Sequence, residues 1–159
     1  MRVLSKIAIT LLTCVLSFPL AAWAQGARAQ GIEIIEHDLF DYANHERSAQ
    51  GLPPLKWDNA LARAAQKHAI VMAQQGTLSH QFPGESSLPS RAALSGVRYV
   101  WLAENVAEGP SAQVIHAQWV KSPNHRANLL DPDMDSIGIA VAERNGQWFA
   151  VEDFSKAKP

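Results

Sequence analysis

The C-terminal part of the chain has the pattern of a β-hairpin, and this feature constrains the fold more than any other. Ile137, Ile139 and Val141 alternate with smaller residues, and Trp148 to Phe154 has the pattern of a second strand. The pair Asn-Gly at 145–146 lies between them and is typical of a type I′ turn, which needs positive φ at both positions. A hairpin is marginal on its own, so other elements must cover its faces.

The segments before the hairpin have helical periodicity, and these helices are the candidates to cover it. Asp58 and Asn59 are N-cap residue types, and Gly76 suits the C′ position that ends a helix. Helices early in the chain and a hairpin late in it predict an α+β layered domain. We expect four helices. The first begins at Ile32 and ends before Gly51, and the second begins at Asp58 or Asn59 and ends at Gly76. The third begins near Arg91 and ends before Gly96, and the fourth runs from Ser111 to Lys121.

The N-terminus has the features of an export signal. Arg2 and Lys6 precede an apolar run over residues 7–20, and Ala-Trp-Ala at 22–24 fits a cleavage site. The alternative is an uncleaved anchor, but the run is shorter than the roughly 20 apolar residues of a membrane span. We therefore expect residues 1–24 to be a signal peptide. The mature chain is then secreted or periplasmic and has no transmembrane segment.

The mature chain has no cysteine, because the sole cysteine, Cys14, lies inside the apolar run. Its stability must come from a packed core, since no disulfide is available in a compartment where disulfides form. Removal of residues 1–24 leaves 12 basic and 15 acidic residues, a formal net charge of −3. The basic residues form no cluster, so we expect no nucleic-acid partner.

Three short stretches contain the residues best suited to chemistry. Ser79-His80, Glu104-Asn105 and the run Ser-Pro-Asn-His-Arg at 122–126 offer two imidazoles and a carboxylate. This set of side chains binds zinc or serves acid–base chemistry near neutral pH. The stretches are far apart in the sequence, so only the fold can bring them together.

Short motifs follow one another in a distinctive order along nearly all of the mature chain. They are Asn44-x-x-Arg47, Gly51-Leu52-Pro53-Pro54-Leu55-x-Trp57, Ser79-His80, Glu104-Asn105, Trp119, Ser122-Pro123-x-His125-Arg126-x-Asn128-Leu129-Leu130 and Ile137-Gly138-Ile139. Their order resembles the bacterial branch of the CAP superfamily, which comprises cysteine-rich secretory proteins, antigens and pathogenesis-related proteins. The resemblance implies a three-layer α-β-α sandwich, secretion, and a surface cleft with a His-Glu-Glu-His tetrad that binds divalent metal.

On this resemblance we divide the mature chain into three parts. Residues 25–36 form an N-terminal arm and the start of the first helix, and residues 25–30 within it are expected to be a loose arm. Residues 37–155 form the CAP domain, and residues 156–159 form a tail.

The resemblance also assigns the tetrad one position at a time. His80 and Glu104 take the first histidine and the first glutamate, and His125 takes the second histidine. The second glutamate should lie three residues after Trp119, where this chain has Ser122. The tetrad is therefore incomplete, with two histidines, one carboxylate and one hydroxyl.

We predict a cleft formed by His80, Glu104, Asn105, Ser122 and His125. Within it, His80, Glu104 and His125 would hold a divalent metal such as zinc, with one position open to water. The alternative is a polar cluster that ties loops together by hydrogen bonds. The residue types do not decide between these two interpretations.

Two classes of function fit such a cleft. The first is a secreted, non-enzymatic binding module that recognises a lipid, glycan or protein ligand. The second is a metal-assisted hydrolase of peptides or cell-envelope material, with Glu104 as general base and His125 as the other catalytic candidate. A Ser122–His125–Glu104 relay is disfavoured because no nucleophile turn surrounds Ser122, which suits a cap or turn. The missing second carboxylate favours the binding module.

Several other residues are assigned structural roles. His68 lies on the apolar face of the second helix, where a hydrogen-bonded core histidine is expected. Arg126 has the fork geometry to bind a carboxylate. Trp57, Trp101 and Trp119 are expected in the core or at its edge.

Overall fold

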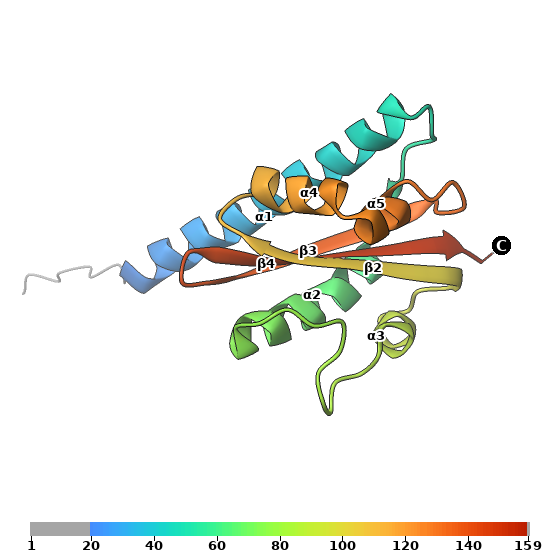
Figure 1. Cartoon of the computed structure of the whole chain (residues 1–159). Coiled ribbons are helices and arrows are strands. Elements are labelled where there is room, and N and C mark those ends of the chain that lie inside the picture. The colour runs from blue at the N-terminus through green and yellow to red at the C-terminus, as the bar shows by residue number, and fades with distance from the viewer. Residues whose placement is uncertain (1–19, 159) are drawn as a thin grey trace, which may run out of the picture.

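The computed structural model describes residues 20–158, which form a four-stranded sheet between two layers of helices (Figure 1). Cys14 and most of the predicted signal peptide lie outside these residues. This architecture confirms the predicted three-layer α-β-α sandwich. The elements in chain order are α1 (Leu20–Ala49), β1 (Lys56–Trp57), α2 (Asn59–Gln75), α3 (Leu88–Leu94), β2 (Tyr99–Gly109), α4 (Ala112–Lys121), α5 (Pro123–Leu129), β3 (Ser136–Arg144) and β4 (Gln147–Ala157).

The strand order is β1-β3-β4-β2, so β2 is an edge strand. The short β1 is parallel to β3, and the longer strands pair antiparallel. The predicted hairpin is present as β3 and β4, and its turn has positive φ at Asn145 (53°) and Gly146 (76°). These angles match the type I′ turn expected from the Asn-Gly pair.

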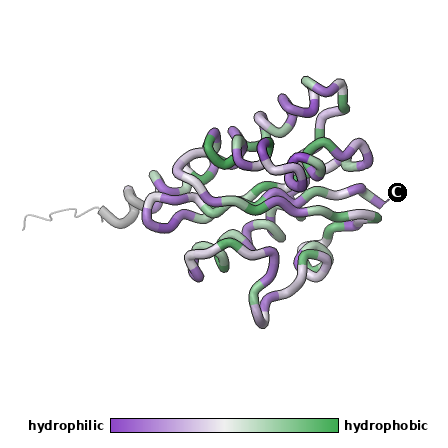
Figure 2. Tube along the Cα trace, viewed as in Figure 1, coloured by the Kyte–Doolittle hydropathy of each residue, from purple (hydrophilic) through white to green (hydrophobic). Residues whose placement is uncertain are grey.

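Each face of the sheet is covered by its own helices: α2 and α3 lie on one face, and α1, α4 and α5 lie on the other (Figure 1). Hydrophobic residues run along the central strands, between the two helical layers (Figure 2). Helix α2 approaches β3 closely, and a Cβ at Gly138 would lie 2.1 Å from the backbone nitrogen of Ala62. Only glycine fits at this position.

The larger part of the core lies on the α1 and α4 side of the sheet. It includes Trp119 and Ile115 of α4 together with Leu39 of α1 and Phe154 of β4. A second cluster joins α2 to the opposite face through alanines and Met72. Small side chains on α2 permit the close helix–sheet packing seen at Gly138.

The predicted ends of α2 are confirmed. The Asp58 side chain accepts hydrogen bonds from the backbone nitrogens of Ala60 and Leu61, as an N-cap residue does. Gly76 ends the helix in the left-handed conformation, with φ of 69°.

Other local predictions were wrong. Residues 25–30 are not a loose arm, because α1 continues through them. The Arg28 guanidinium donates to the carbonyl oxygen of Glu143 at 2.8 Å, and Gly31 lies against the Trp148 ring, so the hairpin supports this part of α1. Strand β4 continues into the predicted tail, as far as Ala157.

Three elements, the short β1 together with β2 and α5, were not expected from the sequence. The position of one residue also differs: Trp101, expected in the core or at its edge, is 61% exposed. Trp101 lies next to the register shift at the start of β2, which interrupts the regular pairing with β4 there.

Arg47 of α1 organises the chain before β3. Its side chain is buried and donates hydrogen bonds to the carbonyl oxygens of Pro53, Leu129, Asp131 and Met134. The Asn-x-x-Arg motif of α1 therefore fixes the loop that follows α5, which positions that helix.

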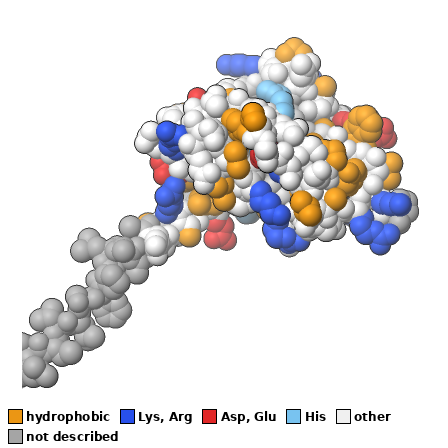
Figure 3. Space-filling view, turned by 90° about the horizontal axis from the view of Figure 1, so that it is seen from below, with side chains coloured by type: hydrophobic (Ala, Val, Ile, Leu, Met, Phe, Trp, Pro, Cys, Tyr) orange, Lys and Arg blue, Asp and Glu red, His pale blue; other side chains and the backbone are white. Residues whose placement is uncertain are grey.

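The surface over α2 and α3 mixes hydrophobic, basic and acidic side chains (Figure 3). Ile70 of α2 and Leu94 of α3 are among the exposed hydrophobic residues. Among residues 20–158, no helix combines the length and the apolar character needed to cross a membrane.

Candidate functional site

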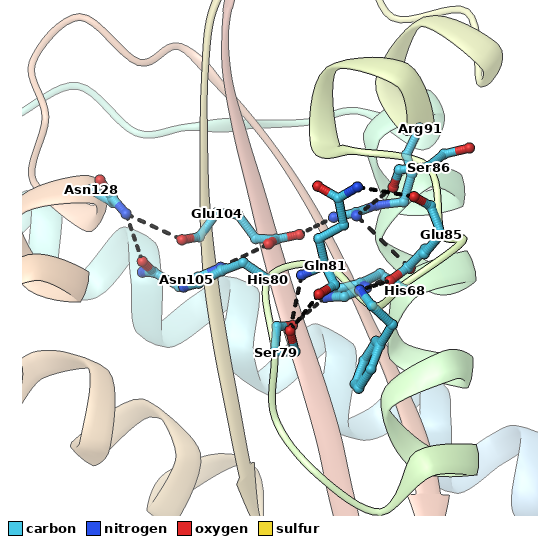
Figure 4. Close-up of polar contacts among 11 residues, drawn as sticks. His68, Ser79, His80, Gln81, Glu85, Ser86, Arg91, Glu104, Asn105 and Asn128 are labelled. Atoms are coloured by element: carbon cyan, nitrogen blue, oxygen red, sulfur yellow. Dashed lines mark hydrogen bonds and ion pairs between the residues drawn. The ribbon is translucent and has the colours of Figure 1, made fainter.

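Glu104 on the edge strand β2 lies at the centre of the polar network drawn in Figure 4. Its Oε1 atom lies 2.9 Å from Nδ1 of His80. Its Oε2 atom accepts a hydrogen bond from Nη2 of Arg91 on α3. Both oxygens of this buried carboxylate are therefore engaged by other side chains.

His80 lies on the loop between α2 and α3, and its side chain is 62% exposed. The hydrogen bond that His80 donates to Glu104 raises the pKa of His80, and partial burial opposes this effect. Since Nδ1 faces the carboxylate, Nε2 is the nitrogen left for a ligand. A carboxylate orients many metal-binding histidines in this way.

Asn105, the next residue on β2, forms hydrogen bonds with α5 in the helical layer on the other face of the sheet. Its Nδ2 atom lies 3.0 Å from the carbonyl oxygen of His125 and 3.2 Å from Oε2 of Glu152. The Asn128 side chain donates to Oδ1 of Asn105 at 2.9 Å and to the Glu104 carbonyl oxygen at 3.3 Å. These bonds attach α5 to the edge strand.

His125 lies on α5, half-buried beside this attachment. Burial lowers the pKa of His125, and the charge of His80 lowers it further. The two imidazoles are thus close enough to interact electrostatically, although they come from opposite helical layers. The structure brings His80, Glu104 and Asn105 together and places His125 beside them.

Ser122 lies at the junction of α4 and α5, where it is both the C-cap residue of α4 and the N-cap residue of α5. Its backbone nitrogen donates to Gln118 and Trp119, and its carbonyl accepts from Arg126. Ser122 thus occupies the predicted cap position, although its side chain forms no capping hydrogen bond. Within the described part of the chain, no hydrogen bond joins the Ser122 hydroxyl to His125, so the geometry gives no support to a serine relay.

The donor set only partly fits a metal ion. In residues 20–158, no group of three or more His, Cys, Asp or Glu side chains is arranged to hold one. The carboxylate of Glu104 is engaged by Arg91 and His80, whereas Nε2 of His80 is open. The nitrogen available to a metal ion is therefore Nε2 of His80, whose ring is oriented by Glu104. Metal binding by His80, Glu104 and His125 stays a prediction.

Arg91 is a site residue that the sequence reasoning missed. Its side chain is buried and donates to Glu104 and, at 3.1 Å, to the carbonyl oxygen of Ser86. Arg126 was expected to bind a carboxylate but forms no ion pair with any described residue. The sequence offered one signal for Arg91: it is a charged residue next to the apolar Ala92 on a short helix, and both side chains are buried.

Asp153 was also missed. It lies directly opposite Glu104 on β4 and is completely buried. Burial raises the pKa of Asp153 well above its ordinary value, and the Glu104 charge adds to this while Arg91 opposes it. Burial and the neighbouring Glu104 charge therefore favour the protonated form of Asp153 more than in a solvent-exposed aspartate.

The remaining structural assignments were largely correct. His68 is completely buried, and both its ring nitrogens have hydrogen-bond partners. Trp119 is buried in the core, as expected. Trp57 is 37% exposed, although its ring lies 5.5 Å from that of Phe40, and Trp101 is 61% exposed.

A mixed four-stranded sheet between two helical layers, with a polar network at its edge strand, defines a three-layer α-β-α domain. Residues 40–154 match the cysteine-rich secretory protein family, also called CAP. This match covers most of the chain, so the chain belongs to the CAP family.

Known proteins share this domain. The chain is 30% identical over 119 residues to the uncharacterized protein YkwD of Bacillus subtilis, a match that covers 74% of this chain and 46% of YkwD. It thus spans less than half the length of that curated relative. Among solved structures, an extracellular protein with an SCP domain from Bacillus anthracis is 27% identical with a TM-score of 0.73. That likeness covers 79% of this chain and 41% of the other.

An outer surface protein of Borrelia burgdorferi has the same fold. It is 24% identical with a TM-score of 0.69, over 76% of this chain and 90% of that one.

Proposed function

We propose that this chain is a secreted, non-enzymatic CAP-domain binding module. Its cleft, at His80, Glu104 and His125, recognises a lipid, glycan or protein feature of the cell envelope. A divalent metal such as zinc, held by the two imidazoles, tunes the affinity for that ligand. The observation that carries the proposal is the engagement of both Glu104 oxygens by Arg91 and His80.

This engagement argues against catalysis by Glu104. A general base must lie within hydrogen-bond reach of the proton it takes and be free to accept it. Here Arg91 and His80 use both oxygens, and the second carboxylate of the family is replaced by Ser122. No observation favours the hydrolase over the binding module.

Metal binding is supported by the orientation of His80. Its Nδ1 is fixed on Glu104 while its largely exposed ring offers Nε2 to solvent. A histidine must be neutral to bind metal, so protons compete with zinc. Because the pKa of His80 is raised, we expect zinc affinity to increase as the pH rises through neutrality.

Secretion is supported by the apolar N-terminal segment and its cleavage pattern. The related Bacillus anthracis protein is described as extracellular. Envelope material is therefore the ligand class that the protein would meet.

The test is a calorimetric zinc titration of the purified protein beside two double variants. His80→Ala/His125→Ala removes both imidazoles of the cleft, and His37→Ala/His45→Ala removes two exposed histidines of α1 as a matched control. We expect one-to-one binding with a dissociation constant of about a micromolar or below in the wild type and control, and none in the cleft variant. Equal binding by the cleft variant, or none by the folded wild type, would refute the metal site.

The same proteins separate binding from hydrolysis. We expect wild-type protein with zinc, magnesium or calcium to turn over neither peptides nor envelope fractions. Envelope lipids or glycans should bind the wild type more tightly than the cleft variant. Turnover that disappears in both Glu104→Ala and His125→Ala, while those variants stay folded, would replace this proposal with the hydrolase.

A further inference from the structure

The loop that carries His80 has no regular secondary structure between the end of α2 at Gln75 and the start of α3 at Leu88. Its position must therefore be set by side-chain contacts. Figure 4 shows these contacts converging on His68 of α2 and on Glu85 and Arg91.

His68 contacts this loop through both ring nitrogens, although it is completely buried. Its Nε2 atom lies 2.7 Å from the carbonyl oxygen of Ser79. A carbonyl oxygen only accepts, so Nε2 carries a hydrogen and donates it. Its Nδ1 atom lies 2.7 Å from Oε1 of Glu85, and this contact must share one further hydrogen between ring and carboxyl.

Glu85 in turn folds the loop around itself. Its Oε2 atom accepts from the backbone nitrogen of Phe82 at 3.0 Å, and its carbonyl oxygen accepts from the Gln81 side chain at 3.1 Å. The Phe82 ring lies with its centroid 6.2 Å from that of His68. The segment from Ser79 to Glu85 is thus closed by hydrogen bonds at both ends, and His68 supplies one bond at each end.

Arg91 connects this segment to the cleft carboxylate. One guanidinium nitrogen, Nη1, donates to the Ser86 carbonyl and lies 3.9 Å from Oε1 of Glu85. The other, Nη2, donates to Glu104, which binds His80. The contacts therefore run from His68 through Glu85, Arg91 and Glu104 back to His80 on the same loop.

We propose that His68 is a positioning residue of the cleft: its two ring nitrogens fix Ser79 and Glu85, and this holds His80 on Glu104 with Nε2 turned to the ligand. The inference rests on the proposed function in one respect, that His80 contacts the ligand. His68 itself touches neither ligand nor metal. A purely structural histidine in the core would stabilise α2 without affecting the state of the His80 ring.

The test compares His68→Gln, His68→Ala and Glu85→Gln with Lys67→Ala, an exposed neighbour on the same helix. Glutamine at position 68 keeps one amide donor for the loop and loses the second contact. Thermal unfolding establishes which variants fold, and if His68→Ala does not, His68→Gln and Glu85→Gln serve as the test.

The first measurement is the ring ¹⁵N NMR shifts of His80 in metal-free protein at alkaline pH, which report the nitrogen that carries the hydrogen. In the wild type and Lys67→Ala we expect a fixed Nδ1 hydrogen, because Nδ1 is bonded to Glu104. In His68→Gln and Glu85→Gln we expect a mixture of tautomers. Zinc affinity should fall by about tenfold to a hundredfold, as for other partners that orient a metal ligand.

A folded His68→Gln with the wild-type His80 tautomer would overturn the positioning role. Wild-type protein that binds no zinc would refute the metal site but not this inference, since the tautomer is measured without metal. The two failures are therefore distinguishable.

Discussion

Replacing the buried acid Glu152 with glutamine should stabilise the protein, and the gain should grow with pH. Glu152 lies on β4 opposite Asn105 and is completely buried. Its Oε2 atom accepts from Asn105, while Oε1 has no hydrogen-bond partner among the described residues. Burial raises the pKa of Glu152 from 4.5 to about 8, with the Asn105 bond opposing this change.

The sign follows from proton binding. Between pH 4.5 and about 8 the folded chain keeps the Glu152 proton that the unfolded chain has lost. The free energy of unfolding therefore falls as the pH rises through this window. With roughly 1.4 kcal/mol for each pKa unit, the loss is about 3 kcal/mol at pH 7 and about 5 kcal/mol by pH 9.

Glutamine has the shape of the protonated acid and keeps an oxygen for Asn105, but it does not ionise. Urea denaturation at pH 5, 7 and 9 should show Glu152→Gln near the wild type at pH 5 and increasingly more stable above it. Glu108→Gln on the neighbouring strand, where the carboxylate is exposed, is the matched control. A stability difference that stays constant from pH 5 to 9 would refute the reasoning.

Arg47→Ala should lower the free energy of unfolding by at least about 3 kcal/mol, because it leaves buried carbonyl oxygens without their charged donor. Urea denaturation measures this loss, with Lys121→Ala, at an exposed position, as the control. A loss under about 1 kcal/mol would contradict the argument. Gly138→Ala should prevent α2 from packing on β3, since the added Cβ would lie 2.1 Å from the Ala62 nitrogen. Circular dichroism should show it unfolded or strongly destabilised, whereas Gly26→Ala, with open space around it, should fold normally; a cooperative wild-type melt of Gly138→Ala would contradict the packing argument.

Elements with local signals could be predicted from the sequence. The cap at Asp58, the stop at Gly76 and the Asn-Gly turn depend on residues a few positions apart, and all are present. Strand β2 has only a partial signal: it begins with the good strand formers Tyr, Val and Trp, but most of the remaining residues in YVWLAENVAEG are alanine, glutamate, asparagine and glycine, which are poor ones. It is a strand because it pairs with β4 along nearly its whole length. Helix α5 did have a signal, proline at its first turn, but the motif was interpreted as a turn.

The same distinction applies to the site. His80, Glu104 and Asn105 were found because their motifs and order are distinctive. Asp153 was missed because its meeting with Glu104 depends on the register between two strands about 50 residues apart. The arginine partner was misassigned because any arginine has the fork for a carboxylate, and only the fold shows that Arg91 reaches Glu104.

The candidate site owes its position to the alternation of side chains along an edge strand. Glu104 and Asn105 are neighbours on β2, so their side chains point to opposite faces of the sheet. Glu104 anchors the His80 loop and α3 on one side, and Asn105 anchors α5 and the carbonyl of His125 on the other. Ser122 belongs to neither anchor, because its backbone forms the hydrogen bonds that join α4 to α5. The position where the resemblance places a second glutamate therefore lies outside the hydrogen bonds that hold Glu104 and Asn105, so a serine there leaves these bonds in place.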